Sequence, residues 1–535
     1  MAATTLVIVG CTPGSSSDKN ASATSQTTSI VTAWPADITN VNPVQGANPQ
    51  DNEVVYNTYQ GLVGYTFKKV DDGSWVQQGS KLAPVLAKSW KVDKTSVTFH
   101  LDPNRVFYPS GNPVRAEDVK WSLGQALQSP NAQDIFTNGL QGEKDIKIVD
   151  EHTVTINFKD QAGKPVEVSP TTLAMFANGN MSIVDSVEAT KHATAKDRWG
   201  ADWLRENTAG TGPYYIKSHT PGQELVLQAV PKHPTPPAFT TVTARIVNDA
   251  NVGSLLKGGE INLAEFNLSQ TDVNTLKAAG FTVASQPAPM LTYLTMGADK
   301  GPFADARVRQ AVAYAIPYDQ IVNSVYFGRA SRALSYVNPT SSAYTKAWGT
   351  YHTDLGAAST LMAKAGHPSI TVPLHYSSAD PAQEDIAILL QENLKRIGIT
   401  VTLTPHTAAE QWDVINGRSR ATSHPGSPDM VLFNWGPWTD DPKIPVGFAS
   451  TTGGVNNYAL WSNPTVDKIN ATWEARAAST ERDAAYKQAQ QIVAEAAPLI
   501  PITYAERQTV LAPGITGASF QQFAGTRFYL LERAH

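Results

Sequence analysis

The chain has 535 residues, enough for about three or four domain-sized units and a large buried core. It carries 42 Lys and Arg against 47 Asp and Glu, a formal charge of -5, and no basic block, which argues against a nucleic-acid partner. Its single cysteine, Cys11, excludes an intramolecular disulfide and a cysteine-rich structural zinc site.

The first predicted segment, residues 1–29, places Cys11 between a short apolar run and a polar stretch rich in Ser and Thr. The preceding Ile-Val-Gly, residues 8–10, resembles the lipobox of bacterial lipoproteins, although no Lys or Arg precedes it. We predict a lipoprotein signal remnant with Cys11 as the lipidation site, followed by a flexible linker. The alternative is a flexible N-terminal segment with an incidental cysteine.

From residue 30 onward, strand and helix patterns interleave. Strand-like alternation occurs in three segments: 95–101, 152–158 and 224–230. Helical spacing of apolar residues occurs in four: 119–127, 308–315, 383–397, and one that begins near Thr480 and ends before Pro498. Gly398 ends the third helix and a strand follows in 399–405. This alternation indicates an α/β fold with open sheets.

Four stretches carry a stronger signal because of their order along the chain. They are NTYQGLVG (57–64), LAPVLAKSWKVDKTSVTFHLDPN (82–104), GPFADARVRQAVAYAI (301–316) and QAQQIVAEAAPLIPI (488–502). Together they resemble the family 5 extracellular solute-binding proteins, the oligopeptide-, dipeptide- and nickel-binding lipoproteins of ABC importers. Within the third stretch we expect Asp305 to cap a helix, and Arg307 and Arg309 to bind nearby carboxylates or carbonyls.

The resemblance implies an α/β, two-lobed, periplasmic-binding-protein-like clamshell with an extra subdomain inserted in the N-terminal lobe. Lobe I would comprise residues 30–57, 204–288 and 498–535, the inserted subdomain 58–203, and lobe II 289–497. A two-stranded hinge would join the lobes, and closure over a ligand would create the form that a permease recognises.

The segment MVLFNWGPWTDDPKIPVGF, 430–448, is the main candidate for ligand contact. An apolar strand runs into an aromatic, Gly/Pro-rich loop that ends in two acids, and such loops commonly carry function. In peptide-binding relatives, an Asp of this loop pairs with the peptide's α-ammonium group. Here Trp435 keeps the first motif position and Asp441 the last acidic one, but Trp438 stands where the amine-binding Asp is expected.

This departure leaves two readings of the loop. If Asp440 reaches inward, it replaces the missing amine anchor and peptides remain suitable ligands, because a buried ammonium needs a counter-charge. If Asp440 faces solvent, a neutral solute such as an oligosaccharide fits better. Trp435 and Trp438 would offer flat faces to either ligand, while Trp438 is also compatible with a packing role.

Three further aromatic residues are weaker candidates for the pocket. Trp34 stands where the first lobe of relatives faces the cleft, Tyr59 shortly precedes the Gly-Leu of the first motif, and Tyr214 follows Gly212-Pro213 at the start of a predicted strand. For each, a core position is an equally good reading of the sequence.

Other classes of function lack their motifs. The chain contains no GxSxG, HExxH or GxxxxGK[ST] pattern, and its eleven histidines are scattered. We therefore expect no enzyme, no metal and no cofactor, with a hydrolase using Asp440 and Asp441 as a distant alternative.

The sequence thus predicts a substrate-binding lipoprotein of an ABC importer, which captures an extracellular oligopeptide and delivers it to permease subunits. An oligosaccharide or other neutral solute is the alternative ligand. We expect a monomer, held by a lipid anchor at the extracellular face of the cell membrane or in the periplasm.

Overall fold

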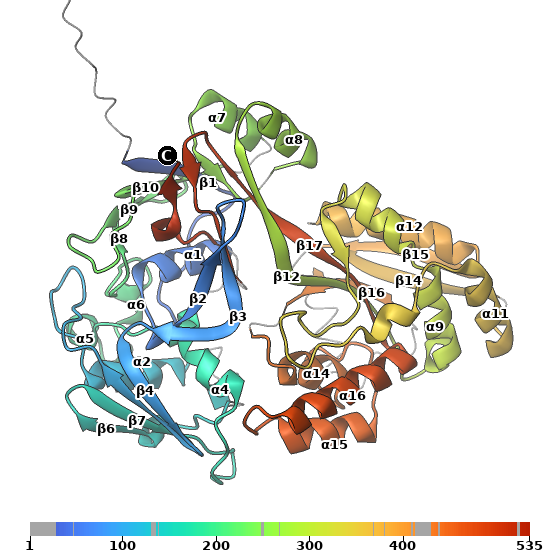
Figure 1. Ribbon diagram of the computed structural model, residues 1–535, viewed down its shortest axis with the longest axis horizontal. Coiled ribbons are helices and arrows are strands. Elements are labelled where there is room, and N and C mark those ends of the chain that lie inside the picture. The colour runs from blue at the N-terminus through green and yellow to red at the C-terminus, as the bar shows by residue number, and fades with distance from the viewer. Residues whose placement is uncertain are drawn as a thin grey trace, which may run out of the picture.

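The computed structural model describes residues 28–46, 48–129, 135–136, 138–247, 251–266, 268–367, 369–378, 380–407, 410–411, 430–436, 439–521 and 525–534. Two of the predicted residues, Cys11 and Trp438, lie outside this part of the chain. Figure 1 shows two bodies linked through the middle by a pair of long strands, β12 and β17. Both bodies mix strands and helices, so the predicted α/β class is confirmed.

The largest sheet within the described residues has 11 strands and runs through both bodies. In order across the sheet they are β15 (Ile399–His406), β14 (Ile370–Ser377), β16 (Met430–Trp435), β12 (Thr282–Met296), β17 (Leu499–Leu511), β11 (Leu263–Ala264), β1 (Ser29–Trp34), β10 (Thr241–Ile246), β9 (Glu224–Ala229) and β8 (Tyr214–Thr220), with β13 (Ala330–Arg332) beside β17.

β12 and β17 form the connection between the bodies. They pair antiparallel from Thr282 opposite Leu511 to Thr295 opposite Leu499, with a register shift between Pro287 and Leu291. The ends at Thr282 and Leu511 belong to the sheet of the left-hand body in Figure 1, and the ends at Thr295 and Leu499 belong to the sheet of the right-hand body. A hinge motion therefore has to act through this strand pair.

The left-hand body contains lobe I and the inserted subdomain, whose residue boundaries stay predictions. The inserted subdomain holds two smaller sheets: β2 (Val63–Lys69) and β3 (Trp75–Pro84), joined by β19 (Ser519–Phe520), and then β4 (Ala87–Asp93), β5 (Ser96–Leu101), β7 (Thr153–Asn157) and β6 (Ile146–Asp150). A two-stranded sheet, β18 (Ile515–Thr516) with β20 (Glu532–Arg533), lies near the C-terminus. Helices of this body are α1 (Pro49–Thr58), α2 (Ala116–Ala126), α4 (Pro170–Ala174), α5 (Ser186–Lys191), α6 (Ala201–Leu204), α7 (Val252–Gly258) and α8 (Gln270–Ala278).

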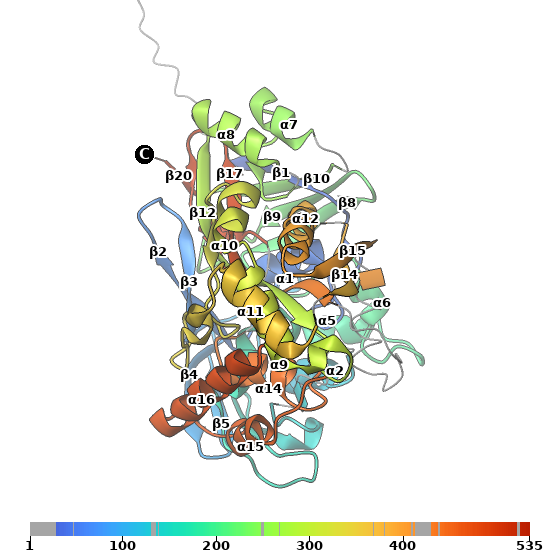
Figure 2. The same cartoon turned by 90° about the vertical axis from the view of Figure 1, so that its right-hand side faces the viewer.

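Lobe II forms the right-hand body and is covered by helices. They are α9 (Ala306–Ala315), α10 (Tyr318–Gln320), α11 (Leu355–Ala365), α12 (Pro381–Lys395), α14 (Lys443–Ser450), α15 (Pro464–Trp473) and α16 (Thr480–Ala496). Figure 2, which looks onto this body, shows α11 and α16 on its outer face.

The predicted elements form for the expected local reasons. All four predicted helices are confirmed, as α2, α9, α12 and α16, and all four strands, as β5, β7, β9 and β15. Asp305 caps α9 by accepting from the Arg307 amide at 2.8 Å, and Arg309 donates to the carbonyl oxygens of Phe303 and Ala496 at 2.6 and 2.7 Å. Gly398 has φ +87°, the left-handed conformation that ends a helix at low cost.

Each part of the molecule has its own hydrophobic core. One cluster is formed by residues between 291 and 504, largely in lobe II, and a second by residues between 44 and 183, largely in the inserted subdomain. A third packs Ile30, Trp34 and Tyr214 against the C-terminal segment. Separate cores allow the lobes to move relative to one another without either being disrupted.

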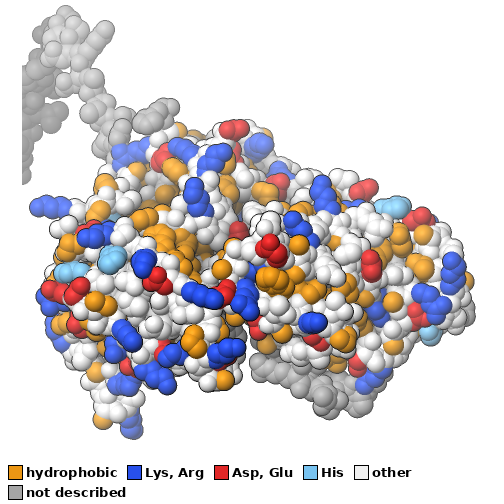
Figure 3. Space-filling model, turned by 60° about the horizontal axis from the view of Figure 1, so that its bottom comes forward, with side chains coloured by type: hydrophobic (Ala, Val, Ile, Leu, Met, Phe, Trp, Pro, Cys, Tyr) orange, Lys and Arg blue, Asp and Glu red, His pale blue; other side chains and the backbone are white. Residues whose placement is uncertain are grey.

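The surface is mixed in charge. On the face drawn in Figure 3, basic and acidic side chains are interspersed, which agrees with the near-balanced composition. Among the described residues, the longest apolar helices fall short of what a bilayer crossing requires.

Candidate ligand-binding site

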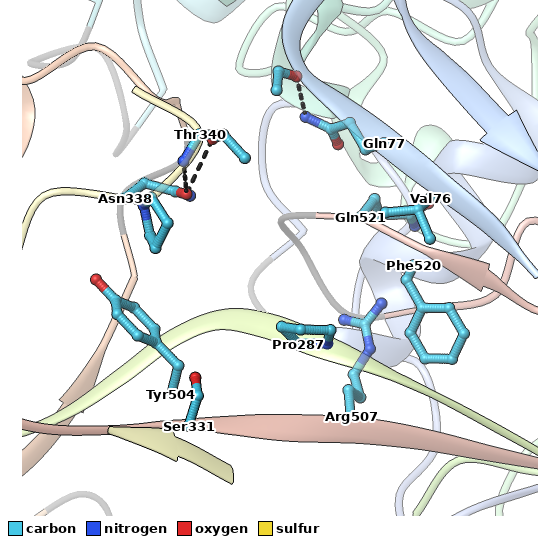
Figure 4. Close-up of a pocket in the computed structure, with 12 residues that line it drawn as sticks. Val76, Gln77, Pro287, Ser331, Asn338, Thr340, Tyr504, Arg507, Phe520 and Gln521 are labelled. Carbon is cyan, nitrogen blue, oxygen red and sulfur yellow. Dashed lines mark hydrogen bonds between the residues drawn. The ribbon is translucent and has the colours of Figure 1, made fainter. Parts of the chain in front are cut away.

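A cavity of about 400 Å³ lies where lobe I, the inserted subdomain and lobe II meet (Figure 4). Its walls come from β3, β12 and β17, from a segment of lobe II, and from the C-terminal segment. The lining residues are Val76, Gln77, Gly79, Pro287, Ser331, Asn338, Pro339, Thr340, Tyr504, Arg507, Phe520 and Gln521. The cavity is therefore built from chain segments that are far apart in sequence.

The polar groups of the cavity wall are held by hydrogen bonds within the protein. The Tyr504 hydroxyl donates to the Ser335 carbonyl at 3.0 Å, and Gln521 donates to the Gly525 carbonyl at 2.6 Å. The Asn338 side-chain oxygen accepts from the Thr340 amide and hydroxyl at 3.0 and 2.9 Å. Such bonds fix the orientation of the wall before a ligand arrives, which reduces the entropy lost on binding.

Arg507 brings the charge to this cavity. Figure 4 shows its side chain rising from β17 beside Pro287, and its guanidinium carbon lies 5.7 Å from the centre of the Phe520 ring. Burial lowers the pKa of Arg507, while the charges of Glu265 and Glu53 act in the opposite direction. A guanidinium stays protonated in proteins, so the wall carries a positive charge.

Two acids of lobe I act on Arg507: Glu53, which is buried, and Glu265, which is half-buried. Glu53 accepts hydrogen bonds from the Trp34 indole N–H at 2.9 Å and from the Thr526 amide at 3.0 Å. Burial, followed by repulsion from Glu265, raises the pKa of Glu53 well above its ordinary value. Neither acid lines the cavity, so the ligand would meet Arg507 and not the carboxylates.

The segment 430–448 comprises β16, a connection and the start of α14, and its two acids, Asp440 and Asp441, lie just before α14 at the boundary with the inserted subdomain. Asp441 is 3% exposed and forms an ion pair with Arg482 at 2.7 Å, and it accepts a hydrogen bond of 2.6 Å from the Thr171 hydroxyl. Burial acts to raise its pKa, but the charges of Arg482 and Lys443 hold the pKa below the ordinary value. Asp441 therefore stays ionised and joins lobe II to α4 of the inserted subdomain.

Asp440 makes a second connection of this kind. Its carboxylate accepts from the Ser80 amide at 3.1 Å and from the Ser80 hydroxyl, both on β3. Burial raises the pKa of Asp440, and the Ser80 hydrogen bonds partly offset this effect. The neighbouring Gly79 has φ +54°, and a Cβ at this position would lie 2.5 Å from an Asp440 oxygen, so the close approach requires glycine.

Two further pairs complete what we call the lobe contacts, which comprise Asp440–Ser80, Asp441–Thr171, Lys443–Asn138 and Arg476–Glu167. The Lys443 ammonium donates to the Asn138 side chain at 2.9 Å, and the Arg476 guanidinium lies 2.9 Å from a Glu167 oxygen. Each pair joins lobe II to the inserted subdomain, so the structure holds the two in contact.

The sequence-predicted aromatic residues occupy other places. Trp34 is 1% exposed, and the Tyr214 hydroxyl donates to the Phe239 carbonyl at 2.6 Å inside the same core. Tyr59, also buried, borders a separate cavity of about 100 Å³ and accepts a hydrogen bond from the Ala209 amide. Trp435 ends β16, half-buried, with its ring 6.4 Å from that of Phe448. None of these described residues, nor Asp440 or Asp441, is among those that line the 400 Å³ cavity.

The sequence analysis did not identify Arg507, Asn338 and Tyr504, which line the 400 Å³ cavity. Arg507 lies between Glu506 and Gln508 in the half-buried middle part of an otherwise largely apolar strand, so the only signal is that polar interruption, which does not single out the arginine. Asn338 lies in an irregular segment and gives no such signal. Among the described residues, no group of three or more His, Cys, Asp or Glu is arranged to hold a metal ion.

Comparison with known proteins places this architecture in a family. The family model for bacterial extracellular solute-binding proteins, family 5 Middle, matches residues 81–457. The probable D,D-dipeptide-binding periplasmic protein DdpA of Escherichia coli strain K12 is 30% identical over 502 residues, which cover 92% of this chain and 91% of that protein.

Solved structures share the fold. The ABC transporter substrate-binding protein CtaP of Listeria monocytogenes aligns with a TM-score of 0.80 at 21% identity, covering 95% of this chain and 99% of that chain. The periplasmic binding protein DppA of Helicobacter pylori, in complex with the peptide STSA, aligns at 0.74 with 20% identity, over 95% and 98% of the two chains. The predicted two-lobed fold is thereby confirmed. The chain belongs to family 5 of the bacterial extracellular solute-binding proteins, the substrate-binding proteins of ABC importers.

Proposed function

We propose that this protein captures a short peptide between its lobes and delivers it to the permease subunits of an ABC importer. The observation that carries the proposal is the cavity of about 400 Å³ where the lobes meet. This volume lies toward the lower end of the range of about 300–1,000 Å³ that is typical of small-molecule sites, which favours a short peptide over a long one. The relative named for D,D-dipeptides and the structural neighbour solved with a peptide support this ligand class.

The protein would capture its ligand by closing the two lobes around it, without a chemical reaction. The cavity wall includes residues of both lobes, so a ligand binds the closed form better than the open one and shifts the equilibrium toward it. Binding at micromolar affinity requires about 8.2 kcal/mol, which contact with Val76, Pro287 and Phe520 together with several hydrogen bonds can supply.

The first experiment weighs what the cavity retains during expression. Native mass spectrometry of the purified protein, followed by denaturation and analysis of the released molecules, should yield a series of peptide masses. Calorimetric titration with those peptides then gives their affinity. Release of hexose-spaced masses, with no peptide, would overturn the peptide assignment.

A neutral solute such as an oligosaccharide is the second candidate. The observation that favours it is the use of Asp440 to hold Ser80, because an acid already bound to the other lobe is a poorer anchor for a peptide ammonium group. Thermal denaturation in the presence of cellobiose tests this candidate, and a raised Tm with sugar but not with peptides would support it. A hydrolase acting through Asp440 and Asp441 stays a distant alternative, which incubation with peptides and chromatography of the products would reveal.

We further propose that Cys11 is lipidated and anchors a monomeric protein at the outer face of the membrane. Two acyl chains would satisfy the need for two membrane-binding signals in stable anchoring. Changing Cys11 to Ser should release the protein from the membrane fraction and remove the lipid mass from its N-terminal peptide. An unchanged membrane fraction would contradict lipidation, and gel filtration of the released protein tests the monomeric state.

A further inference from the structure

We infer that Arg507 is the anion-binding residue of the cavity and that the ligand is held chiefly through a carboxylate group. This inference rests on the proposed function and deepens it, because it states which end of a short peptide the protein recognises. It reverses the polarity expected from the sequence, in which an acid of lobe II anchors the peptide's amine.

The charge of the cavity wall is the first argument. Of its twelve described lining residues, Arg507 is the only Lys, Arg, Asp, Glu or His. A charged ligand group that enters the cavity therefore meets one fixed positive charge at short range. Because this charge lies in the wall of a cavity and not on the open surface, it acts through a lower dielectric than a surface charge and favours an anion over a cation.

The second argument is the chemistry of the Arg507 and Asn338 side chains. A guanidinium presents several N–H donors in a planar fork that matches the two oxygens of a carboxylate. Asn338 uses its side-chain oxygen on Thr340, so its amide N–H₂ offers a further donor at the cavity wall. Figure 4 shows Asn338 on the side of the cavity opposite Arg507, so this second donor suits another acceptor of the ligand, such as a peptide carbonyl, while the carboxylate binds Arg507.

The third argument is that the predicted amine anchor is already used. Asp440 lies behind Gly79, outside the lining, and accepts hydrogen bonds from Ser80 as part of the lobe contacts. Asp441 pairs with Arg482 and Thr171. Both acids of the loop therefore support closure, while the cation of the hinge strand faces the cavity.

The packing of Arg507 explains why it can serve as a fixed anchor. The Phe520 ring centre lies 5.7 Å from the guanidinium carbon, and the charge of the half-buried Glu265 attracts the guanidinium from the side of lobe I. Since β17 is one of the two strands that join the lobes, an anion on Arg507 sits at the point about which closure occurs. A ligand that binds there first could then be covered by lobe II.

The test compares peptides that differ only at their ends. Full-length protein is incubated with an equimolar library of di- and tripeptides, with the same library amidated at the C-terminus, and with the library acetylated at the N-terminus, and bound masses are quantified by native mass spectrometry. Amidation should weaken binding by about tenfold or more, because it removes a hydrogen-bonded charge, while acetylation should have the smaller effect. A larger loss on acetylation would overturn the inference.

A non-peptide pair separates this inference from the proposed function. Binding of glutarate but not of glutaramide, with no peptide bound, would support carboxylate recognition and refute the peptide proposal. Failure of every carboxylate probe, peptide or not, would refute the inference.

Variants of Arg507 locate the effect. Arg507→Gln should bring the affinities for free-acid and amidated peptides close together, and Arg507→Lys, which keeps the charge beside the two acids but loses the planar fork, should retain part of the preference. Arg332→Gln is the matched control, because Arg332 packs on the Tyr318 ring and is not among the lining residues. An undiminished preference for free acids in a folded Arg507→Lys and Arg507→Gln would overturn the assignment.

Discussion

Replacing Thr171 by Val tests whether the lobe contacts stabilise the closed form. The Thr171 hydroxyl donates to Asp441 at 2.6 Å across the boundary between the lobes, and both side chains are buried there. Valine keeps the shape but loses the donor, while Asp441 retains its ion pair with Arg482. A hydrogen bond to a charged group contributes about 1.5–3 kcal/mol net, so the closed form should lose about tenfold to 150-fold relative to the open form, in which water satisfies both groups.

Two measurements together detect this shift. If the ligand-free protein is mainly closed, small-angle X-ray scattering should show a larger radius of gyration for Thr171→Val. If it is mainly open, the scattering stays the same but the apparent Kd for a bound peptide should rise by the full factor, because fewer molecules are competent to bind.

Thr98→Val is the matched control. It removes a 2.9 Å hydrogen bond to Thr155 that lies wholly inside the inserted subdomain. This variant should alter neither scattering nor affinity. The reasoning would be refuted by a Thr171→Val protein whose scattering and affinity both equal those of the wild type.

Three more outcomes are expected. Gly79→Ala should weaken peptide binding roughly tenfold or more, because the new Cβ would lie 2.5 Å from the Asp440 carboxylate oxygen of lobe II. Gly111→Ala is the control: Gly111 also has a positive φ, +78°, but open space around it, so this variant should lose stability without losing affinity. Burial, and then the charge of Glu265, raises the pKa of Glu53, so the folded state keeps a proton that the unfolded chain releases at about pH 4.3. The stability due to this proton is lost as the pH rises, so the Tm of Glu53→Gln relative to that of the wild type should increase between about pH 4.5 and 8. A Tm difference that stays constant over this range would contradict the raised pKa. Trp34→Phe should lower the unfolding free energy by about 1–3 kcal/mol in urea denaturation, since Glu53 loses a buried donor, and leave peptide affinity unchanged; the reverse pattern would give Trp34 a role in binding.

The fold could be predicted well from the sequence because its signals are local. Periodicity located α9, α12 and α16, and the residues that begin or end them, Asp305 and Gly398, act through their own backbone neighbourhood. The order of the four motifs supplied the two-lobed architecture. None of these inferences needed to know which residues distant in sequence would meet.

The cavity could not be predicted in the same way, because it depends on such meetings. β3 contributes Gln77 and Gly79, while β17, more than four hundred residues later, contributes Tyr504 and Arg507. Trp34 and Tyr214 show the converse problem. A large aromatic residue beside a strand end looks the same in sequence whether it faces a ligand or the core, and here the partners that decide it are the Glu53 carboxylate and the Phe239 carbonyl.

The two acids of the loop at 430–448 illustrate the physical reason most directly. A buried carboxylate has to be paired or hydrogen-bonded, and the sequence shows the need without showing which group meets it. For Asp441 the partners are Arg482 and the hydroxyl of Thr171, which lies 270 positions away along the chain. For Asp440 the partner is Ser80, 360 positions away.

In a protein that works by closing, a polar group at the boundary can bind the other lobe or bind the ligand, and the two uses compete for the same hydrogen bonds. The residues to consider for ligand recognition are therefore the polar groups that still face the cavity in the closed form, and not the adjacent acids of the segment 430–448. By this criterion we expect the acids Asp440 and Asp441 to stabilise the closed state, and we propose that Arg507 selects what the closed state encloses. The two sets make separable predictions: changes at the acids should alter affinity for all ligands alike, whereas changes at Arg507 should alter the preference between them.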